Sequence, residues 1–573
     1  MSTKTPMNYR FNLSDTVGTV GYVSCEPPQD ITFDEALAYL ETHPLDDFMH
    51  KHLISRLQQF DQKPFKALLK TAVQEYEIIN PVLASLLYET CLLYGKFSKL
   101  LAYFPDNAAE QLQEYTPLIY IRWFKQEDRY DHLAWITKFK ENIHDHKMLP
   151  LPDVAEDFDL PLLYAPTTDE AITAATIREE LLQTPYSAPY VRPPAQETTD
   201  LALSRLDNTA ILADVEMRHI ASLSPIALLR RWNIDLSVTN GTLDYTLQGL
   251  STSYGRGLAL ADARVGLTME IVERASAFAS FTASGVANTS KKHPLTHARF
   301  SELTKQGINA FDPNLLPLEV PYEDEMLYWM EGHTPAEDGS AYEPILVPAQ
   351  MVYMFCNLDE VSLFSSPGST GLASGNILAE AKVAALMEIF ERDAEATTPF
   401  NKKDCFTLAT DDPKLNMLLN DYAARGVHVM FQDITTEFGI PCYYAFVMDR
   451  RGTVVRGAGA GLDGKKAIVS ALTETPYPYP QSPPSAPALR GVEVRKHSDL
   501  PNVSMEDAHR NLEMLEKLLI ANNRRPVYVE LARTDLQFPV VKALIPNMEL
   551  TADFDSFTRV SRRLFNNYLK MEA

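Results

Sequence analysis

A six-residue pattern occurs twice in this chain. Residues 269–274 read Met-Glu-Ile-Val-Glu-Arg, and residues 387–392 read Met-Glu-Ile-Phe-Glu-Arg. Each copy follows a glycine-containing run and lies in a stretch rich in strong helix formers, which predicts a loop followed by a helix. Glutamates three residues apart share one face of a helix. The chain is therefore expected to contain two loop–helix units, each presenting a pair of carboxylates.

The second copy has the longer context. A glycine-rich run, residues 367–376, leads into a predicted helix over residues 378–396 that contains no Gly or Pro. On this helix three glutamates fall within about 80° of one another, on a face separate from an apolar stripe; they are Glu380, Glu388 and Glu391, and the stripe is Val383, Leu386, Ile389 and Phe390. Such carboxylates can hold Mg²⁺ while loop N–H groups and the helix N-terminus meet phosphate. The alternative is an acidic face that is simply solvated.

The first copy favours the metal interpretation. Gly255-Arg256-Gly257 precedes a predicted helix over residues 260–278, which carries Glu270 and Glu273 on one face. Several Mg²⁺ ions on a triphosphate need carboxylates from more than one side. The sequence therefore predicts that the two glutamate pairs face one shared site.

These motifs resemble the signatures of the YcaO family, ATP-using enzymes that activate peptide amides. The family's G-K-G-like loop and first E-x-x-E-R are similar to residues 255–257 and 270–274. Its S-N-G-x-A-x-G-N run, followed by E-A and E-x-x-E-R-D, is similar to residues 369–376, 380–381 and 388–393. The resemblance covers about residues 190–573.

The resemblance implies a set of ligands. It assigns Mg²⁺ to Glu270, Glu273, Glu388 and Glu391. It assigns ATP to Arg192, Thr199, Arg256, Asn376 and Glu380. It assigns no catalytic nucleophile, because such a site works by positioning and charge neutralisation.

The implied reaction is Mg-ATP-dependent phosphorylation of a backbone amide oxygen in a peptide or protein. A side chain or external sulfide would then complete azoline or thioamide formation. Azoline-forming members commonly end in P-x-P-x-P, whereas this chain has that pattern at residues 476–480 and ends in Lys-Met-Glu-Ala. In addition, Thr475-Pro476 follows Ala471–Glu474 where the family often has Gln and Arg. The second departure leaves the family's usual basic residue unassigned. The missing C-terminal motif favours thioamidation or an uncharacterised modification.

Two alternatives remain open at this stage. The chain could be a non-catalytic or weakly ATP-binding accessory protein for sulfur transfer or methylthiolation of a ribosomal or other protein. The retention of both E-x-x-E-R sets, Asn376 and Glu380 favours ATP chemistry instead. Residues 459–466 nearly match the P-loop pattern. Lys466 occupies the position at which a P-loop needs Ser or Thr to bind Mg²⁺, which argues against a P-loop here.

Composition and local patterns divide the chain into three segments. Residues 1–165 carry signals for short helices, including a capping box at Thr32–Glu35, and predict an all-α domain of helical hairpins, with a tetratricopeptide-like array as one option. Residues 166–190 predict a proline-rich linker. Residues 191–573 mix helical and strand patterns without strict alternation, which predicts an α+β catalytic domain containing the loop–helix duplication and able to fold alone.

Charge and cysteine content restrict the environment. A net charge of −24 argues against general binding to nucleic acid or anionic membrane. The five cysteines are scattered without C-x-x-C, and no apolar run reaches membrane-spanning length. We therefore expect a cytoplasmic protein. Its expected partners are a peptide or protein substrate, a protein docked on the N-terminal helices, and a second copy in a homodimer.

Overall fold

The computed structural model of the 573-residue chain describes residues 6–14, 22–167, 170–186, 189–339, 341–366, 368–505 and 507–571. A few residues of the predicted segments lie outside this part: Pro367 of the glycine-rich run, and Thr168, Asp169, Ser187 and Ala188 of the predicted linker. The architecture mixes helices and sheets, as the α+β prediction required.

The first sheet is built around a long hairpin. Its strands run in the order β2 (Tyr22–Glu26), β1 (Met7–Ser14), β7 (Asp244–Gly257), β6 (Ile226–Thr239), β8 (Phe281–Thr282) and β9 (Gly285–Val286), and β5 (Met217–Arg218) also pairs with β6. Strand β1 runs parallel to β7, with Met7 opposite Tyr245 and Phe11 opposite Gly249. The first strand of the chain is therefore part of the sheet that leads to Arg256.

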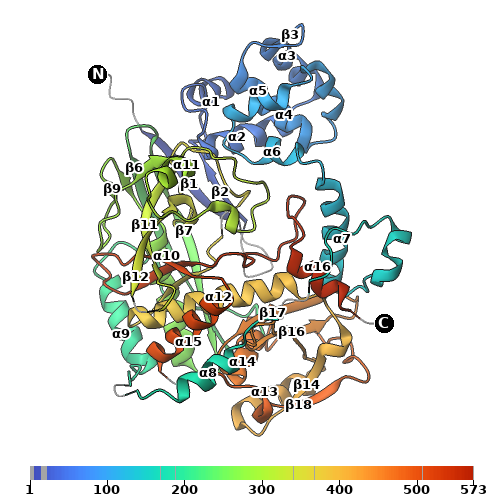
Figure 1. Cartoon of the computed structure of the whole chain (residues 1–573), viewed down its shortest axis with the longest axis vertical. Helices are drawn as coiled ribbons and strands as arrows, with labels where there is room; N and C mark the ends of the chain where they lie inside the picture. The colour runs from blue at the N-terminus through green and yellow to red at the C-terminus, as the bar shows by residue number, and fades with distance from the viewer. Residues whose placement is uncertain are drawn as a thin grey trace.

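The N-terminal helices gather at one end of the molecule (Figure 1). They are α1 (Phe33–Leu40), α2 (Asp47–Gln58), α3 (Gln62–Ala72), α4 (Pro81–Leu93), α5 (Ala108–Leu112) and α6 (Tyr120–Phe124), followed by α7 (Arg129–Asp145); a short hairpin, β3 (Val73–Gln74) and β4 (Glu77–Ile78), follows α3. The predicted capping box at Thr32 and Glu35 is present.

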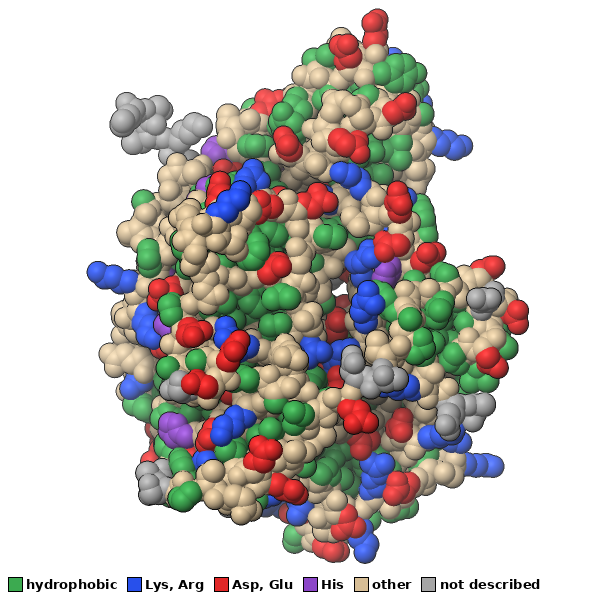
Figure 2. Space-filling view, in the orientation of Figure 1, with side chains coloured by type: hydrophobic (Ala, Val, Ile, Leu, Met, Phe, Trp, Pro, Cys, Tyr) green, Lys and Arg blue, Asp and Glu red, His purple; other side chains and the backbone are tan. Residues whose placement is uncertain are grey.

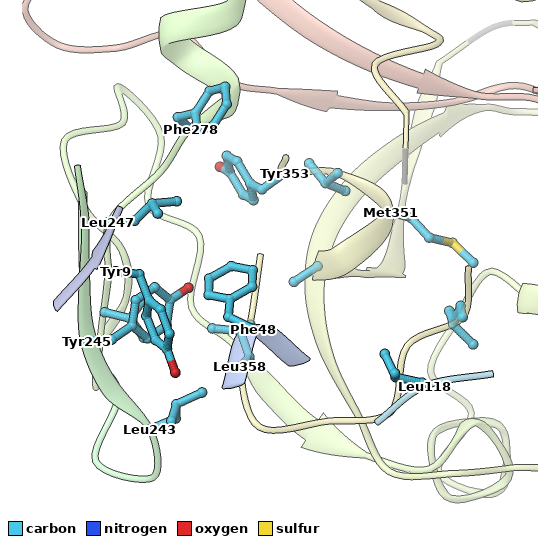
Figure 3. Packing of buried hydrophobic residues seen from close by; sticks show 14 of the residues in the cluster. Tyr9, Phe48, Leu118, Leu243, Tyr245, Leu247, Phe278, Met351, Tyr353 and Leu358 are labelled. Carbon is cyan, nitrogen blue, oxygen red and sulfur yellow. The ribbon is translucent and has the colours of Figure 1, made fainter. Parts of the chain in front are cut away.

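The N-terminal region differs from the predicted all-α domain, because β1 and β2 precede its helices and belong to the first sheet. Figure 3 shows how they are joined: Tyr9 of β1, Phe48 of α2 and Tyr245 of β7 pack edge to face. The ring centroids of Tyr9 and Phe48 lie 5.2 Å apart. One hydrophobic cluster thus runs from the N-terminal helices into the sheet.

Two further sheets complete the body. One has the order β10 (Thr296–Ala298), β11 (Leu327–Pro335), β19 (Val527–Glu530), β20 (Val540–Leu544) and β13 (Leu372–Ser374), with β12 (Tyr342–Pro348) on β11. The other has the order β17 (Val454–Ala460), β16 (Cys442–Met448), β15 (Met430–Asp433), β14 (Cys405–Ala409) and β18 (Glu493–Lys496). The helices beside them include α11 (Phe300–Lys305), α13 (Pro413–Ala424), α14 (Gly464–Glu474), α15 (Ala508–Ala521) and α16 (Arg562–Leu569).

The predicted linker is partly structured. It contains α8 (Ala174–Leu182), whose buried Ile177 and Leu181 join the hydrophobic cluster around α15. Helix α9 (Ala195–Leu206) follows and packs on α10 (Leu260–Ala277). The composition of this segment is that of a linker, but its apolar residues Ile177 and Leu181 are buried against α15.

The two helices that carry the repeated motif approach each other through β13. Helix α10 packs on β7 and β13, and α12 (Leu378–Thr397) packs on β13, β20 and α15. Leu386, Ile389 and Phe390 of α12 are buried as predicted, whereas Val383 is only half-buried. None of the helices in the described ranges is long and apolar enough to cross a membrane.

Acidic and basic side chains are mixed over the face drawn in Figure 2. A narrow hollow opens near the middle of this face, and acidic side chains are visible inside it. The strong net negative charge is thus not spread as one uniform surface.

Candidate active site

The glycine-rich loop meets Glu388 through a single backbone group. The Gly371 N–H donates to Glu388 Oε2 over 3.1 Å. Gly371 has φ +82°, and a Cβ there would lie 2.4 Å from the Ala543 carbonyl oxygen. Only glycine fits this conformation and this close approach without strain. Glycine at position 371 therefore allows the loop to lie where the Gly371 N–H reaches the Glu388 carboxylate.

The first copy is built in a related way. Gly255 on β7 lets the strand approach α10 closely, because a Cβ there would lie 2.0 Å from the Ala263 carbonyl oxygen. The Tyr254 N–H then donates to Glu270 Oε2 over 2.9 Å. Arg274 lies 3.8 Å from Glu270 and 3.4 Å from Glu273. Each glutamate of this pair thus has a cation or an N–H donor beside it.

The two copies share one electrostatic environment. Burial raises the pKa of Glu273 to about 8, Arg274 opposes the shift, and the charges of Glu388 and then Glu270 strengthen it. Glu388 is therefore close enough to Glu273 for its charge to disfavour the ionised form of Glu273. This is the kind of juxtaposition that the repeated motif predicts.

Glu391 of α12 and Glu474 of α14 also influence the charges of this site. Glu391 accepts from the Ala460 N–H and from Arg392, each over 2.9 Å. Burial raises its pKa to about 7, an effect that Arg392 opposes and the charges of Glu395 and Glu474 strengthen. Glu474, the last residue of α14, also raises the pKa of Glu270, after the larger effect of burial. Glu474 thus lies between the two copies.

A cleft of about 590 Å³ opens beside the first copy. Its walls come from β7, α10 and α14, and Arg256 forms an ion pair with Glu474 across them. The lining residues are Tyr254–Leu258, Asp262, Gly266, Glu270, Arg274, Val469, Ser470, Thr473 and Glu474. Two guanidinium groups and three carboxylates therefore meet in one concave surface, which suits a phosphate–metal complex.

The predicted nucleotide ligands gather at the start of α12. Glu380 Oε2 accepts from the Asn376 N–H and from Asn376 Nδ2, both over 2.9 Å. Arg192 Nε lies 3.2 Å from Glu380 Oε1, with most of its side chain exposed. Thr198, rather than Thr199, donates its hydroxyl to Asn376 Oδ1 over 2.9 Å. The Thr199 hydroxyl donates to the Ala195 carbonyl oxygen within α9.

The near P-loop has another structural role. Gly459 on β17 packs against α14, since a Cβ there would lie 2.3 Å from the Ala467 carbonyl oxygen. Asp463 caps α14 by accepting from the Lys465 N–H over 3.0 Å. The acidic cap occupies the helix N-terminus, where a P-loop would place phosphate.

The donor set fits Mg²⁺ in its chemistry. Magnesium prefers carboxylate oxygens, and crowded carboxylates with raised pKa values are stabilised by a divalent cation. Within the described ranges, no three His, Cys, Asp or Glu side chains are arranged closely enough to enclose a metal ion. Glu273 and Glu391 contact arginines instead. Metal binding would require these carboxylates to turn from their arginine partners.

The repeated motif and the cleft lie in the segment that matches a known family. Residues 254–477 match the model of the YcaO family, described as a cyclodehydratase that binds ATP and Mg²⁺. Residues 254–477 are thus similar to the YcaO domain, whose cofactors are ATP and Mg²⁺. The matched segment contains both glutamate pairs and Glu474.

Two relatives carry no assigned function in their names. An uncharacterized protein of Methanothermobacter thermautotrophicus is 29% identical over 337 residues, which are 52% of this chain and 81% of the relative. An uncharacterized protein in the tfuA 3′ region of Rhizobium leguminosarum bv. trifolii is 31% identical over 121 residues, 18% of this chain and 29% of the relative.

Solved structures with similar regions include two of related type. A heterocyclase in complex with substrate and cofactor is 17% identical with a TM-score of 0.49, and the match covers 65% of this chain and 55% of that one. The YcaO protein of Methanopyrus kandleri bound with AMPPCP and Mg²⁺ is 19% identical with a TM-score of 0.44, covering 63% of this chain and 93% of that one. The chain thus spans about half of the heterocyclase.

Proposed function

We propose that this protein uses Mg-ATP to phosphorylate a backbone amide oxygen in a peptide or protein, as the first step of thioamide or azoline formation. The observation that supports the proposal is the charge interaction between Glu273 of the first pair and Glu388 of the second, beside a cleft lined by Arg256 and Arg274. A solvated acidic face would not bury its carboxylates or raise their pKa values.

The chain's residues can be assigned separate tasks. When bound, ATP supplies the phosphoryl group and Mg²⁺ neutralises its charge. Glu270, Glu273, Glu388 and Glu391 would hold the metal, as the family resemblance implies. Arg256 and Arg274 face the cleft and can offset charge on a transferred phosphoryl group.

The cluster at the start of α12 would orient the nucleotide. Thr198 and Glu380 fix the two ends of the Asn376 side-chain amide, so its orientation is set by both neighbours. Arg192, mostly exposed and paired with Glu380, can reach a bound phosphate or ribose. Thr199 stays a predicted ligand, with its hydroxyl engaged inside α9.

The product depends on the nucleophile that attacks the phosphorylated amide. In either case the nucleophile bonds to the amide carbon, and the carbon–oxygen bond breaks with phosphate leaving. External sulfide replaces the oxygen by sulfur, whereas a Cys, Ser or Thr side chain closes a ring with net loss of water. Intact-mass analysis of a treated substrate peptide distinguishes a gain in mass from a loss.

Calorimetry with ATP, in the presence and absence of Mg²⁺, tests the first step. We expect Mg²⁺-dependent binding by the wild type and a half-saturating Mg²⁺ concentration raised at least about tenfold in Glu388→Gln. Glu493→Gln is the control, because Glu493 is an exposed glutamate of β18. No Mg²⁺-dependent binding by the intact wild type would refute the enzymatic proposal.

A docking function has independent support at the other end of the molecule. Tyr76, Ile79 and Tyr103 of the N-terminal helical region are large apolar residues with at least half of their surface exposed. Such residues favour a protein contact. If the wild type bound a partner through this region but bound no ATP, the accessory-protein alternative would replace the enzyme.

A further inference from the structure

A buried lysine outside the repeated motif contacts the glycine-rich loop. Lys542 on β20 is 6% exposed, and its Nζ donates to the Thr370 carbonyl oxygen over 2.7 Å and to the Gly368 carbonyl oxygen over 3.4 Å. Its backbone lies opposite Leu372 in the β13–β20 ladder. The lysine therefore holds the loop from the neighbouring strand.

The same loop segment presents its N–H to the second glutamate pair. Gly371, the residue after Thr370, donates to Glu388 and accepts from the Ala543 N–H over 2.7 Å. Residues 542 and 543 of β20 thus bind three carbonyl groups of the loop, those of residues 368, 370 and 371. Moving the loop would remove the N–H donor from Glu388.

The charges that face Lys542 belong to the candidate site. Burial lowers the pKa of Lys542 to about 8, while Glu388 and Glu273 favour its charged form and Arg274 opposes it. A buried cation needs compensating partners. Here the partners are loop carbonyls and the glutamates of both copies, so the lysine is bound into the site itself.

We propose that Lys542 is a positioning residue of the ATP-activating site: by binding the Gly368 and Thr370 carbonyl oxygens it holds the loop so that the Gly371 N–H fixes Glu388 for metal. The inference rests on the proposed function, because it concerns the same Mg²⁺ site. Groups that orient metal ligands typically change metal affinity or activity by about 10–100-fold when they are removed.

A second buried lysine offers a matched comparison. Lys382 on α12 is 5% exposed, and burial likewise lowers its pKa to about 8. Its Nζ lies over the rings of Tyr342 and Tyr528, 3.6 Å and 4.3 Å from their centroids. This lysine contacts aromatic rings and not the glycine-rich loop, so its replacement tests the general effect of losing a buried ammonium group.

The experiment compares Lys542→Met, Lys542→Arg and Lys382→Met in the full chain. Calorimetry gives the Mg²⁺ concentration that half-saturates ATP binding, and phosphate release gives kcat. For Lys542→Met we expect a half-saturating Mg²⁺ concentration raised about tenfold and kcat lowered by about tenfold or more. Lys542→Arg should recover most of both, and Lys382→Met should stay within about twofold of the wild type.

The sign of the change separates positioning from charge. Removing a cation beside two carboxylates would, by Coulomb's law alone, strengthen Mg²⁺ binding. Loss of the loop contact instead weakens it. Stronger or unchanged Mg²⁺ binding by a folded Lys542→Met protein would overturn the inference.

A double-mutant cycle tests whether Lys542 acts through Glu388. In the Glu388→Gln background, Lys542→Met should change the half-saturating Mg²⁺ concentration by less than about twofold, because the group that it positions is already altered. Full additivity would overturn the inference. If Lys542→Met does not fold, Lys542→Gln replaces it in the cycle.

Failure of the inference differs from failure of the proposed function. A wild type without Mg²⁺-dependent ATP binding removes both. A wild type that binds Mg-ATP, with Lys542→Met indistinguishable from Lys382→Met, removes the role of Lys542 and leaves the function standing.

Discussion

Mg²⁺ binding should depend steeply on pH, because two of the predicted ligands hold protons near neutrality. The pKa is raised to about 8 for Glu273 and to about 7 for Glu391. A carboxylate must lose its proton before it binds the metal. Raising the pH from 6 to 8 therefore removes a competing proton from both sites.

The size of the effect follows from the two pKa values. A group of pKa 8 contributes about 50-fold between pH 6 and pH 8, and a group of pKa 7 about tenfold. Together they strengthen Mg²⁺ binding on the order of 500-fold, or about 4 kcal/mol. Calorimetry at each pH, in buffers of different ionisation enthalpy, would measure the affinity and the number of protons released.

Two controls sharpen this experiment. Glu391→Gln should lose the part of the dependence that comes from pKa 7, whereas the exposed-site variant Glu493→Gln should retain all of it. An affinity that changes by less than about threefold between pH 6 and pH 8, without proton release, would refute the assignment of buried protonated glutamates as ligands.

Further predictions follow from single contacts. In metal-free protein the raised pKa of Glu273 means that its contribution to stability is present at low pH and is lost as the pH rises through about 8, so the Tm should fall between pH 6 and pH 9, and Mg²⁺ should restore it. Glu391→Gln should abolish ATP turnover yet leave the Tm nearly unchanged at pH 7, as shown by phosphate release and a thermal melt. Gly371→Ala should destabilise by more than about 1 kcal/mol in urea unfolding, because φ is positive and the Ala543 carbonyl is close; an unchanged midpoint would contradict this. Thr198→Val should weaken ATP binding by about tenfold at constant Mg²⁺ dependence, whereas Thr199→Val should not.

The elements with strong local signals could be predicted from the sequence. The helix expected over residues 378–396 is α12, Leu378–Thr397, and the helix expected over residues 260–278 is α10, Leu260–Ala277. The capping box expected at Thr32–Glu35 is present at the start of α1. Hydrophobic periodicity, helix-forming residues and caps act within a few residues of the chain. They can therefore be recognised in the sequence without knowledge of the fold.

The elements that depend on distant partners could not be predicted from the sequence. Strand β1 pairs with residues 245–249, more than two hundred positions away, and nothing in its own residues shows that partner. Helix α8 was not predicted, because prolines on both sides of it dominate the composition of the predicted linker.

Some residues of the candidate site could likewise be predicted from the sequence, and others could not. The glutamate pairs are visible as a repeated motif, and the repeat led to the prediction of one shared site; the charge of Glu388 acts on Glu273, which is consistent with it. Glu474 carries a signal in the A-L-x-E pattern of residues 471–474, but only the fold shows that it lies between the copies. Lys542 has no motif of its own, because its role comes from the pairing of β20 with β13.

The parallel pairing of β1 with β7 has a practical consequence for shortened versions of this protein. The strand that ends in Gly255-Arg256-Gly257 has β1 as its neighbour on one side, from Tyr245 to Gly249. A chain that begins at residue 190 would leave the backbone N–H and C=O groups of that side without partners, and exposed strand edges pair with other chains. Such a fragment is expected to aggregate or to lose its cleft, whereas adding residues 6–26 back as a separate peptide should restore both.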